Sequence, residues 1–284
     1  MDLGFRELAT GLGATEGPVI TQGGEVLVTS MDHGRLYRVD GDQPIIYATT
    51  GGGPNGAAEG PDHRIYVAQN GGQWRNWHPG YMAGMTGGIQ VVGPGRSIEW
   101  LTLDPISPND LCFGPDGYLY ITDSTRRRTD DGRIWRCDIE NGRADLLLSV
   151  SWFPNGIAFG REDDALYVAS TFEQRIYRFP LSRARLGRPE TVVQLLKGRP
   201  DGFAFDIDGN FLVAALPGED GVSELQVWTP HGRLIETVIG GDGQRLSNVA
   251  LSPAGQLIVT DAGSQAALIV EGWPTAGLPL HPFR

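Results

Sequence analysis

Six polar residues recur at the same place in six similar segments of the chain. In each segment this head residue precedes an apolar run, a turn and a second apolar run, and the clearest copies begin at Pro108 and Pro200. The heads are Glu16, Asn55, Asn109, Asn155, Asp201 and Ser247. All six side chains offer oxygen, two of them as carboxylates, and none offers sulfur. Such a set suits a hard divalent cation, with Ca²⁺ favoured and Mg²⁺ or Mn²⁺ next.

A simpler explanation applies to some of these residues taken singly. Asn55, Asn155 and Asp201 are each followed by Gly. Asn-Gly and Asp-Gly are common turn formers, so each pair could simply end a strand. That explanation does not account for Glu16, which has no such turn role. The six heads together therefore favour a ligand set over six unrelated turns.

The spacing of the heads predicts the fold. Successive heads are 39, 54, 46, 46 and 46 residues apart. A period near 45 residues with several short strands is typical of a propeller or a repeat array. In the third repeat we expect strands over 109–113, 118–122, 132–138 and 144–148, which is one four-stranded antiparallel blade. The sequence thus predicts an all-β, six-bladed β-propeller formed as a single domain over residues 1–284. We expect the N-terminal segment 5–9 to close the ring as the outer strand of the last blade.

The turn after each first strand follows a regular rule. A glycine lies eight residues after four of the heads, and in the remaining two repeats Arg64 or Asp163 is expected to take its place. Because the first strand of every blade lines the central channel of a propeller, the six heads should meet at one mouth of that channel.

The second repeat carries an insert over residues 70–88, which explains its 54-residue spacing. The insert is rich in aromatic side chains for a surface loop. We expect it to cover the site as a lid, with packing on the propeller face or on another subunit as the alternative. Its candidate substrate-binding residues are Trp74, Trp77, His78 and Tyr81.

Composition excludes several classes of protein. The net charge of −11 argues against a nucleic-acid binder, which needs a basic face. No window approaches about 18 uninterrupted apolar residues, and the N-terminus lacks a signal-peptide pattern, so we expect no membrane partner. Two cysteines, Cys112 and Cys137, without a metal-binding spacing predict reduced thiols in a cytoplasmic protein. The expected partner is a small-molecule substrate, and the protein is expected to be a monomer or a homo-oligomer.

Four motifs at the head positions resemble those of one known family. They are Thr15-Glu16-Gly17-Pro18, Pro108-Asn109-Asp110, Phe153-Pro154-Asn155-Gly156 and Pro200-Asp201-Gly202. In their order and spacing they are similar to the senescence marker protein / gluconolactonase / luciferin-regenerating enzyme-like family. The resemblance implies a six-bladed propeller with one divalent cation in its channel, Ca²⁺ foremost and Zn²⁺, Mn²⁺ or Mg²⁺ as alternatives. It also implies the ligands Glu16, Asn155 and Asp201, with Asn109 in or just outside the coordination shell.

The members of this family are mostly lactonases, so the resemblance implies a metal-dependent lactonase here. Asp201 is expected to be the general base for the attacking water, with direct nucleophilic attack by Asp201 as the competing version. Asn55 and Asn109 would orient substrate or water. Asp123, which follows the second strand of the third repeat, is expected to contact substrate.

At two positions this sequence departs from the residues that characterised relatives carry. Ser107, expected at the substrate pocket, stands where sugar-lactone members commonly carry Arg, and this disfavours a polar aldonolactone. Ala204 stands where the related phosphotriesterase branch has an acid for a second calcium. We therefore expect a less polar lactone. The alternatives are an organophosphate or related ester hydrolase and a non-catalytic ligand-binding propeller.

Overall fold

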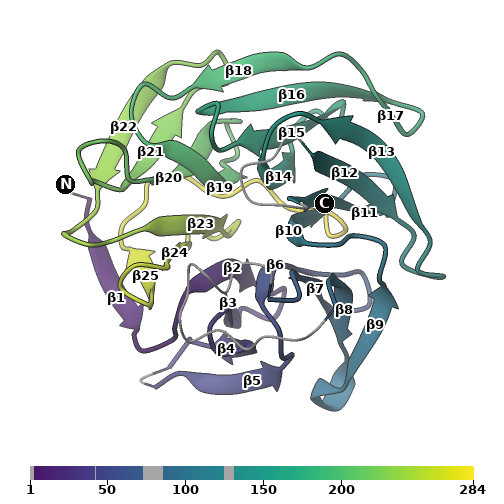
Figure 1. Cartoon of the computed structure of the whole chain (residues 1–284). Coiled ribbons are helices and arrows are strands. Elements are labelled where there is room, and N and C mark those ends of the chain that lie inside the picture. The colour runs from purple at the N-terminus through teal and green to yellow at the C-terminus, as the bar shows by residue number, and fades with distance from the viewer. Residues whose placement is uncertain (1–2, 42, 73–85, 125–130) are drawn as a thin grey trace.

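The computed structural model of the protein describes residues 3–41, 43–72, 86–124 and 131–284. Its strands form six antiparallel sheets arranged as blades around a central channel, as Figure 1 shows. The helical structure among the described residues is a short 3-10 turn at Pro94–Arg96. The predicted six-bladed β-propeller is therefore confirmed.

Each of the first three blades has four strands, and in each blade the first strand is innermost. The first blade comprises β2 (Thr15–Ile20), β3 (Val26–Ser30), β4 (Arg35–Arg38) and β5 (Ile45–Thr49). The second comprises β6 (Pro54–Glu59), β7 (Ile65–Gln69), β8 (Gly88–Val92) and β9 (Ile98–Thr102). The third comprises β10 (Pro108–Phe113), β11 (Leu119–Asp123), β12 (Gly132–Cys137) and β13 (Ala144–Val150), close to the predicted ranges.

The fourth blade has an additional short strand. It comprises β14 (Pro154–Phe159), β15 (Ala165–Ser170), β16 (Arg175–Ser182) and β18 (Glu190–Gln194), and β17 (Arg185–Leu186) pairs with the end of β16. The fifth blade comprises β19 (Arg199–Phe205), β20 (Phe211–Leu216), β21 (Glu224–Trp228) and β22 (Leu234–Ile239).

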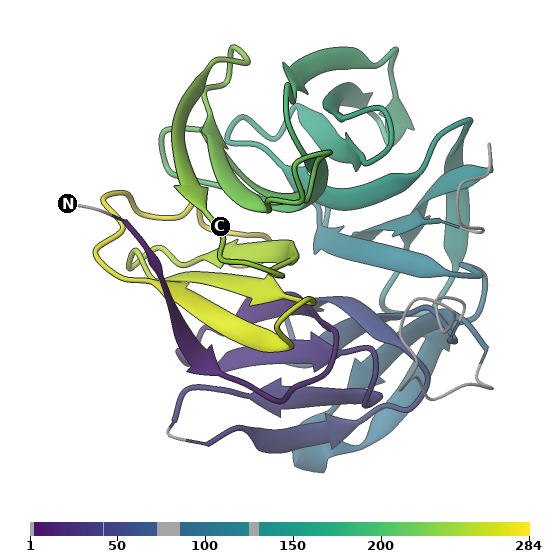
Figure 2. The same ribbon diagram turned by 60° about the vertical axis from the view of Figure 1, so that its left-hand side comes forward.

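The last blade joins the two ends of the chain. Its strands are β23 (Leu246–Leu251), β24 (Leu257–Asp261), β25 (Ala266–Val270) and β1 (Phe5–Ala9). Strand β1 pairs antiparallel with β25, with Phe5 opposite Val270, and Figure 2 shows the purple N-terminal strand along the yellow one. The predicted closure by the N-terminal strand is confirmed. It fixes the ring because the first and last blades cannot separate without breaking this pairing.

The apolar core lies between the blades. Six clusters of buried side chains each join two neighbouring blades, including the last and the first. Strand alternation explains this, because side chains on both faces of a blade are covered by the adjacent blades. The six innermost strands are also neighbours around the channel. The head residues are therefore held on a closed, rigid frame.

The turn after each first strand needs a residue with positive φ. Gly117 and Gly209 adopt φ of 79° and 83° there, which costs a glycine little. In the fourth blade Asp163 takes this role with φ of 56°, as predicted. In the second blade the residue is His63, with φ of 58°, and the expectation of Arg64 was wrong by one position.

Cys112 and Cys137 are both free, so the prediction of unpaired thiols is confirmed. Within the described ranges no helix has the length and apolar character that a membrane crossing requires.

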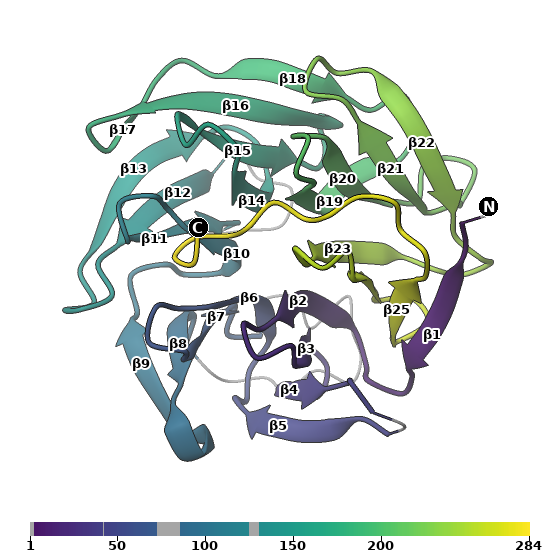
Figure 3. The ribbon, with the colours of Figure 1, turned by 180° about the vertical axis from the view of Figure 1, so that it is seen from behind.

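The C-terminal segment crosses the channel mouth opposite to the head residues, and Figure 3 shows it in yellow over the innermost strands. It bounds a second cavity of about 400 Å³ together with apolar side chains of the first strands. The segment is anchored at its end, where Asp163 Oδ1 lies 2.8 Å from His281 Nε2 and 3.0 Å from Arg284 Nη1.

This anchor yields a stability prediction. We expect Asp163→Asn to lower the free energy of unfolding by about 1 kcal/mol, since it weakens the partly buried contacts of the Asp163 carboxylate with Arg284 and His281. Asp145→Asn is the control, because the Arg143–Asp145 pair is 76% and 47% exposed. It should have almost no effect. Urea denaturation of both variants tests this, and equal midpoints would contradict the anchoring role.

Candidate metal centre

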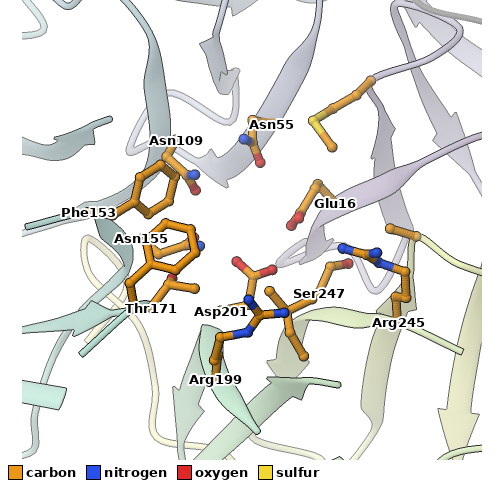
Figure 4. Close-up of a pocket in the computed structure, with 14 residues that line it drawn as sticks. Glu16, Asn55, Asn109, Phe153, Asn155, Thr171, Arg199, Asp201, Arg245 and Ser247 are labelled. Atoms are coloured by element: carbon orange, nitrogen blue, oxygen red, sulfur yellow. The ribbon is translucent and has the colours of Figure 1, made fainter. Parts of the chain in front are cut away.

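All six head residues line one cavity of about 80 Å³ at one mouth of the channel. Each head side chain is at most 8% exposed. Figure 4 shows the side chains of Glu16, Asn55, Asn109, Asn155 and Asp201 directed toward a common centre. Residues separated by as many as 231 positions in the sequence therefore meet in one place, as the repeat spacing predicts.

A β-bulge at every head explains how the side chains reach the cavity. In all six blades the pairing between the first and second strands shifts register at or just after the head residue. Pro108 pairs with Asp123 and Leu111 with Ile121, for example, which leaves Asn109 and Asp110 outside the regular ladder. A bulge bends its strand and turns a side chain away from the normal alternation. The heads can therefore face the channel while the residues before and after them continue the blade.

The two carboxylates of the site are buried close to one another. Burial raises the pKa of Asp201 to about 7, and a hydrogen bond from Asn155 partly offsets this rise. Burial also raises the pKa of Glu16 well above its ordinary value, and the negative charge of Asp201 raises it further. Without a cation, ionising both carboxyl groups is therefore costly, since two buried negative charges repel each other. A bound dication would remove this penalty.

The amide side chains are held in different ways. Asn155 Nδ2 donates a hydrogen bond of 3.0 Å to Thr171 Oγ1, and Thr171 in turn donates to the Pro200 carbonyl oxygen at 2.9 Å. Asn55 Oδ1 is buried, and no described residue donates a hydrogen bond to it. A buried acceptor without a donor is costly unless a ligand completes it. This oxygen is an observation in favour of a bound cation or water at the centre.

The donor set fits a hard cation. Two carboxylates and three amides supply oxygen within one cavity. Ser247 is less suited, because its Oγ already contacts the Thr15 carbonyl oxygen at 2.9 Å and Thr260 Oγ1 at 3.0 Å. Among the described residues, no group of three or more His, Cys, Asp or Glu side chains could hold a metal. A cation here would depend on amide oxygens, which is usual for Ca²⁺ and unusual for Zn²⁺.

A second layer of residues directly follows the heads. Four of these positions are glycine, and the other two are Asp110 and Asn248. Burial raises the pKa of Asp110 to about 6, while hydrogen bonds from Leu111 N and Asn248 act in the opposite direction. The glycines leave room for these two side chains within the channel. A methyl group on Gly56, for instance, would lie 2.7 Å from the Asp110 Cα.

This crowding makes a second prediction. We expect Gly56→Ala to lower the free energy of unfolding by about 1–3 kcal/mol, because the methyl group would meet backbone atoms that cannot move aside. Gly23→Ala is the matched control, since a methyl group there has its nearest contact at 3.7 Å, to Thr21 Oγ1. Urea midpoints measure both. A neutral Gly56→Ala would contradict close packing in this layer.

Two residues predicted to bind substrate do not line the cavity. Asp123 is fully buried, and its carboxylate accepts hydrogen bonds from the backbone of Ile106 and Ser107 and from Trp135 Nε1 at 3.2 Å. It fixes the chain before β10 instead of facing the channel. Ser107 is also fully buried, in the segment that Asp123 holds.

Four further predictions concern the insert. Trp74, Trp77, His78 and Tyr81 lie outside the described residues, and the proposed lid stays a prediction.

Sequence reasoning missed several residues of the cavity. Arg199 and Arg245 line it with charge, and the apolar wall consists of Met31, Phe153, Phe172, Leu216 and Ala262. Phe153, Arg199 and Arg245 each stand two residues before a head. This offset was only a partial signal in the sequence, since Ser107 stands at the same offset from Asn109 and does not line the cavity.

The fold and this cavity together define a class: a six-bladed propeller with a buried ring of oxygen-bearing side chains at one mouth of its channel. The chain belongs to the SMP-30/Gluconolactonase/LRE-like family, whose profile matches residues 14–263. The resemblance inferred from the four head motifs is therefore confirmed.

Individual relatives agree with this assignment. A gluconolactonase of Zymomonas mobilis subsp. mobilis is 30% identical over 236 residues, which are 74% of this chain and 61% of that protein. The adipocyte plasma membrane-associated protein of Danio rerio is 27% identical over 67% of this chain and 51% of its own length. The chain thus spans between half and two thirds of the length of these curated relatives.

A solved structure has the same fold. Regucalcin from Agrobacterium tumefaciens, a calcium-binding protein, superposes with a TM-score of 0.78 at 18% identity, covering 99% of this chain and 98% of its own.

Proposed function

We propose that this protein is a divalent-metal-dependent lactonase that hydrolyses cyclic esters. The observation that carries the proposal is the meeting of Glu16, Asn155 and Asp201 in one buried cavity with Asn55 and Asn109 beside them. Membership of a family that includes gluconolactonase supports the same reaction class. Ca²⁺ is the proposed cation because the donors are all oxygen and three of them are neutral amides.

The proposed ligands are Glu16, Asn155 and Asp201, with Asn109 in or next to the shell. When bound, the cation would polarise the lactone carbonyl and stabilise the negative charge that develops on its oxygen. Asn55 and Asn109 would orient the substrate and the attacking water. The apolar wall with Phe153 would exclude bulk water from the reacting ester, which strengthens every charge interaction inside the cavity.

Asp201 is the proposed general base. It would accept a proton from a water molecule as the water oxygen attacks the carbonyl carbon, and the proton would then pass to the alkoxide that leaves the opened ring. Asn155, fixed by Thr171, holds the Asp201 carboxylate in place through its hydrogen bond. Nucleophilic attack by Asp201 itself is the competing version.

The cavity also favours a substrate with few hydroxyl groups. Its wall combines Met31, Phe153, Phe172 and Leu216, and the described lining offers few neutral polar groups beyond the head ring and Thr171. A sugar aldonolactone needs a partner for each hydroxyl, since unpaired polar groups are costly to bury. We propose a lactone with fewer hydroxyl groups than a sugar aldonolactone.

A substrate screen tests the proposal. The protein is stripped with EDTA, reloaded with Ca²⁺, Mg²⁺, Mn²⁺ or Zn²⁺, and assayed with a pH indicator on gluconolactone, aliphatic lactones and dihydrocoumarin. We expect acid release from the lactones that lack sugar hydroxyl groups, and this release should stop when the chelator is present. Hydrolysis of paraoxon in their place would favour a phosphotriesterase. Metal binding by calorimetry without any hydrolysis would favour a ligand-binding propeller.

A further inference from the structure

Two arginines belong to the same layer of the cavity. Arg199 and Arg245 each precede a head residue by two positions, on the fifth and sixth blades, and both line the cavity. Each therefore shares the channel side with the head that follows it, Asp201 or Ser247. Figure 4 shows the Arg199 guanidinium next to Asp201 and the Arg245 guanidinium on the side of Glu16 and Ser247.

Arg199 is held in place but keeps donors available. Its Nη2 donates a hydrogen bond of 3.3 Å to the Pro217 carbonyl oxygen, and its Cζ lies 6.0 Å from the centre of the Phe172 ring. Its Nε is buried and has no hydrogen-bond partner among the described residues. Among those residues Arg199 also forms no salt bridge within 4.0 Å. A buried guanidinium N–H without an acceptor points to a missing anionic partner.

Arg245 is fixed through its backbone. Its N donates to Asp261 Oδ1 at 2.8 Å, and its carbonyl oxygen accepts from Ala262 N at 3.0 Å. The side chain is exposed at the mouth, so it can meet a substrate as it enters. The positive charges of Arg245 and Arg199 both lower the pKa of Asp201, which agrees with their place beside the ring.

The charge balance of the cavity decides what it can hold. Among the described lining residues, the charged ones are Glu16, Asp201, Arg199 and Arg245. A bound dication would neutralise the two carboxylates and leave the two guanidinium charges in excess. On the other side, Phe153 lies with Asn109 and Asn155. The cavity therefore offers an apolar wall for a ring and a positively charged wall for an anion.

We propose that the substrate is a lactone whose ring carries a carboxylate group, and that Arg199 and Arg245 bind this carboxylate. This inference rests on the proposed lactonase function. Planar guanidinium groups match a carboxylate with paired hydrogen bonds, which fixes the orientation of the ring as well as adding affinity. When Arg199 and Arg245 bind the carboxylate of a small lactone, the ester carbonyl of its ring would face the head residues.

A matched pair of substrates tests the inference. We compare 5-oxotetrahydrofuran-2-carboxylate with its carboxamide, which has the same ring and shape but no charge. Each rate is divided by the rate of the uncatalysed hydroxide reaction, so that intrinsic reactivity cancels. We expect kcat/KM to favour the carboxylate by about 10–100-fold, the usual worth of charge-assisted hydrogen bonds.

Variants show whether the arginines cause this preference. Arg199→Gln and Arg245→Gln should each reduce the ratio, and the double variant should bring it close to one. Arg199→Lys should keep part of it, because it retains the charge but loses the planar fork. Arg233→Gln is the control, since Arg233 is exposed in the turn before β22 and does not line the cavity. Circular dichroism confirms that each variant is folded.

A binding measurement separates this inference from the proposed function. Calorimetry with tetrahydrofuran-2-carboxylate, which has no ester to hydrolyse, should show binding that Arg199→Gln and Arg245→Gln weaken about tenfold or more. If the neutral lactone is hydrolysed as well as the charged one, or the variants keep the wild-type ratio, the inference is wrong and the lactonase stands. If neither lactone is hydrolysed, the lactonase is wrong, and loss of carboxylate binding in the variants still supports the anion site.

Discussion

Asp201→Asn should reduce lactone hydrolysis by a factor of about 10³ or more and leave the protein folded. A positioned general base contributes about 10²–10⁴ to the rate, and this substitution also removes one charged oxygen ligand of the proposed cation. The metal-free variant should be at least as stable as the wild type, since the change removes a buried carboxylate that is costly to ionise. Steady-state kinetics at saturating Ca²⁺ and thermal melting of the EDTA-treated protein measure the two effects.

A second carboxylate of the same blade is the matched control. Asp206 is 2% exposed and accepts hydrogen bonds from the backbone of Asp208 and Asn210 in the turn at the far end of β19. Asp206→Asn should lower stability and leave kcat unchanged. Activity within tenfold of wild type in Asp201→Asn would remove Asp201 from the mechanism. A single turnover in ¹⁸O-water then tests the base version, which places the label in the first product. A nucleophile version in which water attacks the Asp201 carbon leaves the first product unlabelled.

Removal of the cation should change how stability depends on pH. Asp201 and Glu16 have raised pKa values in the folded protein, so between the ordinary carboxyl pKa and the raised value the folded state binds more protons than the unfolded state. The contribution of these two carboxyl groups to the free energy of unfolding of the metal-free protein is therefore fully present below about pH 4. It is lost as the pH rises to about 7, the pKa of Asp201 in the folded protein. The loss should be on the order of a few kcal/mol.

Calcium should reverse this trend, because a cation binds the ionised carboxylates and gains affinity as they lose their protons. We expect urea unfolding in EDTA to show stability decreasing from pH 4 to 7, relative to a Glu16→Gln/Asp201→Asn double variant. The difference between the two proteins removes the contributions of the other titrating groups to the pH dependence of stability. With saturating Ca²⁺ the wild type should be the more stable protein at pH 7. Identical pH profiles for the wild type and the variant in EDTA would contradict the buried pair.

Local sequence patterns were enough to predict the blades. The repeated heads and turn residues fix six hairpins, because strand alternation and turn chemistry depend on residues close to one another in the chain. The pairing of β1 with β25 was also predictable, since a closed ring leaves one outer strand to be supplied by the other terminus.

The composition of the candidate centre was predictable for the same reason. Once the blades form a ring, symmetry brings Glu16, Asn155 and Asp201 to one mouth. Ser107 and Asp123 show the limit of this reasoning. Ser107 precedes Asn109 by two residues and Asp123 pairs with Pro108 beside it, but neither lines the cavity. Which side chains reach the cavity depends on the bulge in β10, and a bulge depends on the pairing of two strands. No sequence window contains that information.

By itself, the sequence determined the number of blades, their strand order and the oxygen donors that meet in the channel. Only the tertiary structure decided that Arg199 and Arg245 share the cavity with Asp201, that Asp123 is enclosed by backbone donors, and that the C-terminal segment covers the opposite mouth. The physical reason is the range of the interactions. Periodicity and turns act over a few residues, whereas burial, charge balance and the direction of a side chain depend on neighbours that only the closed ring brings together.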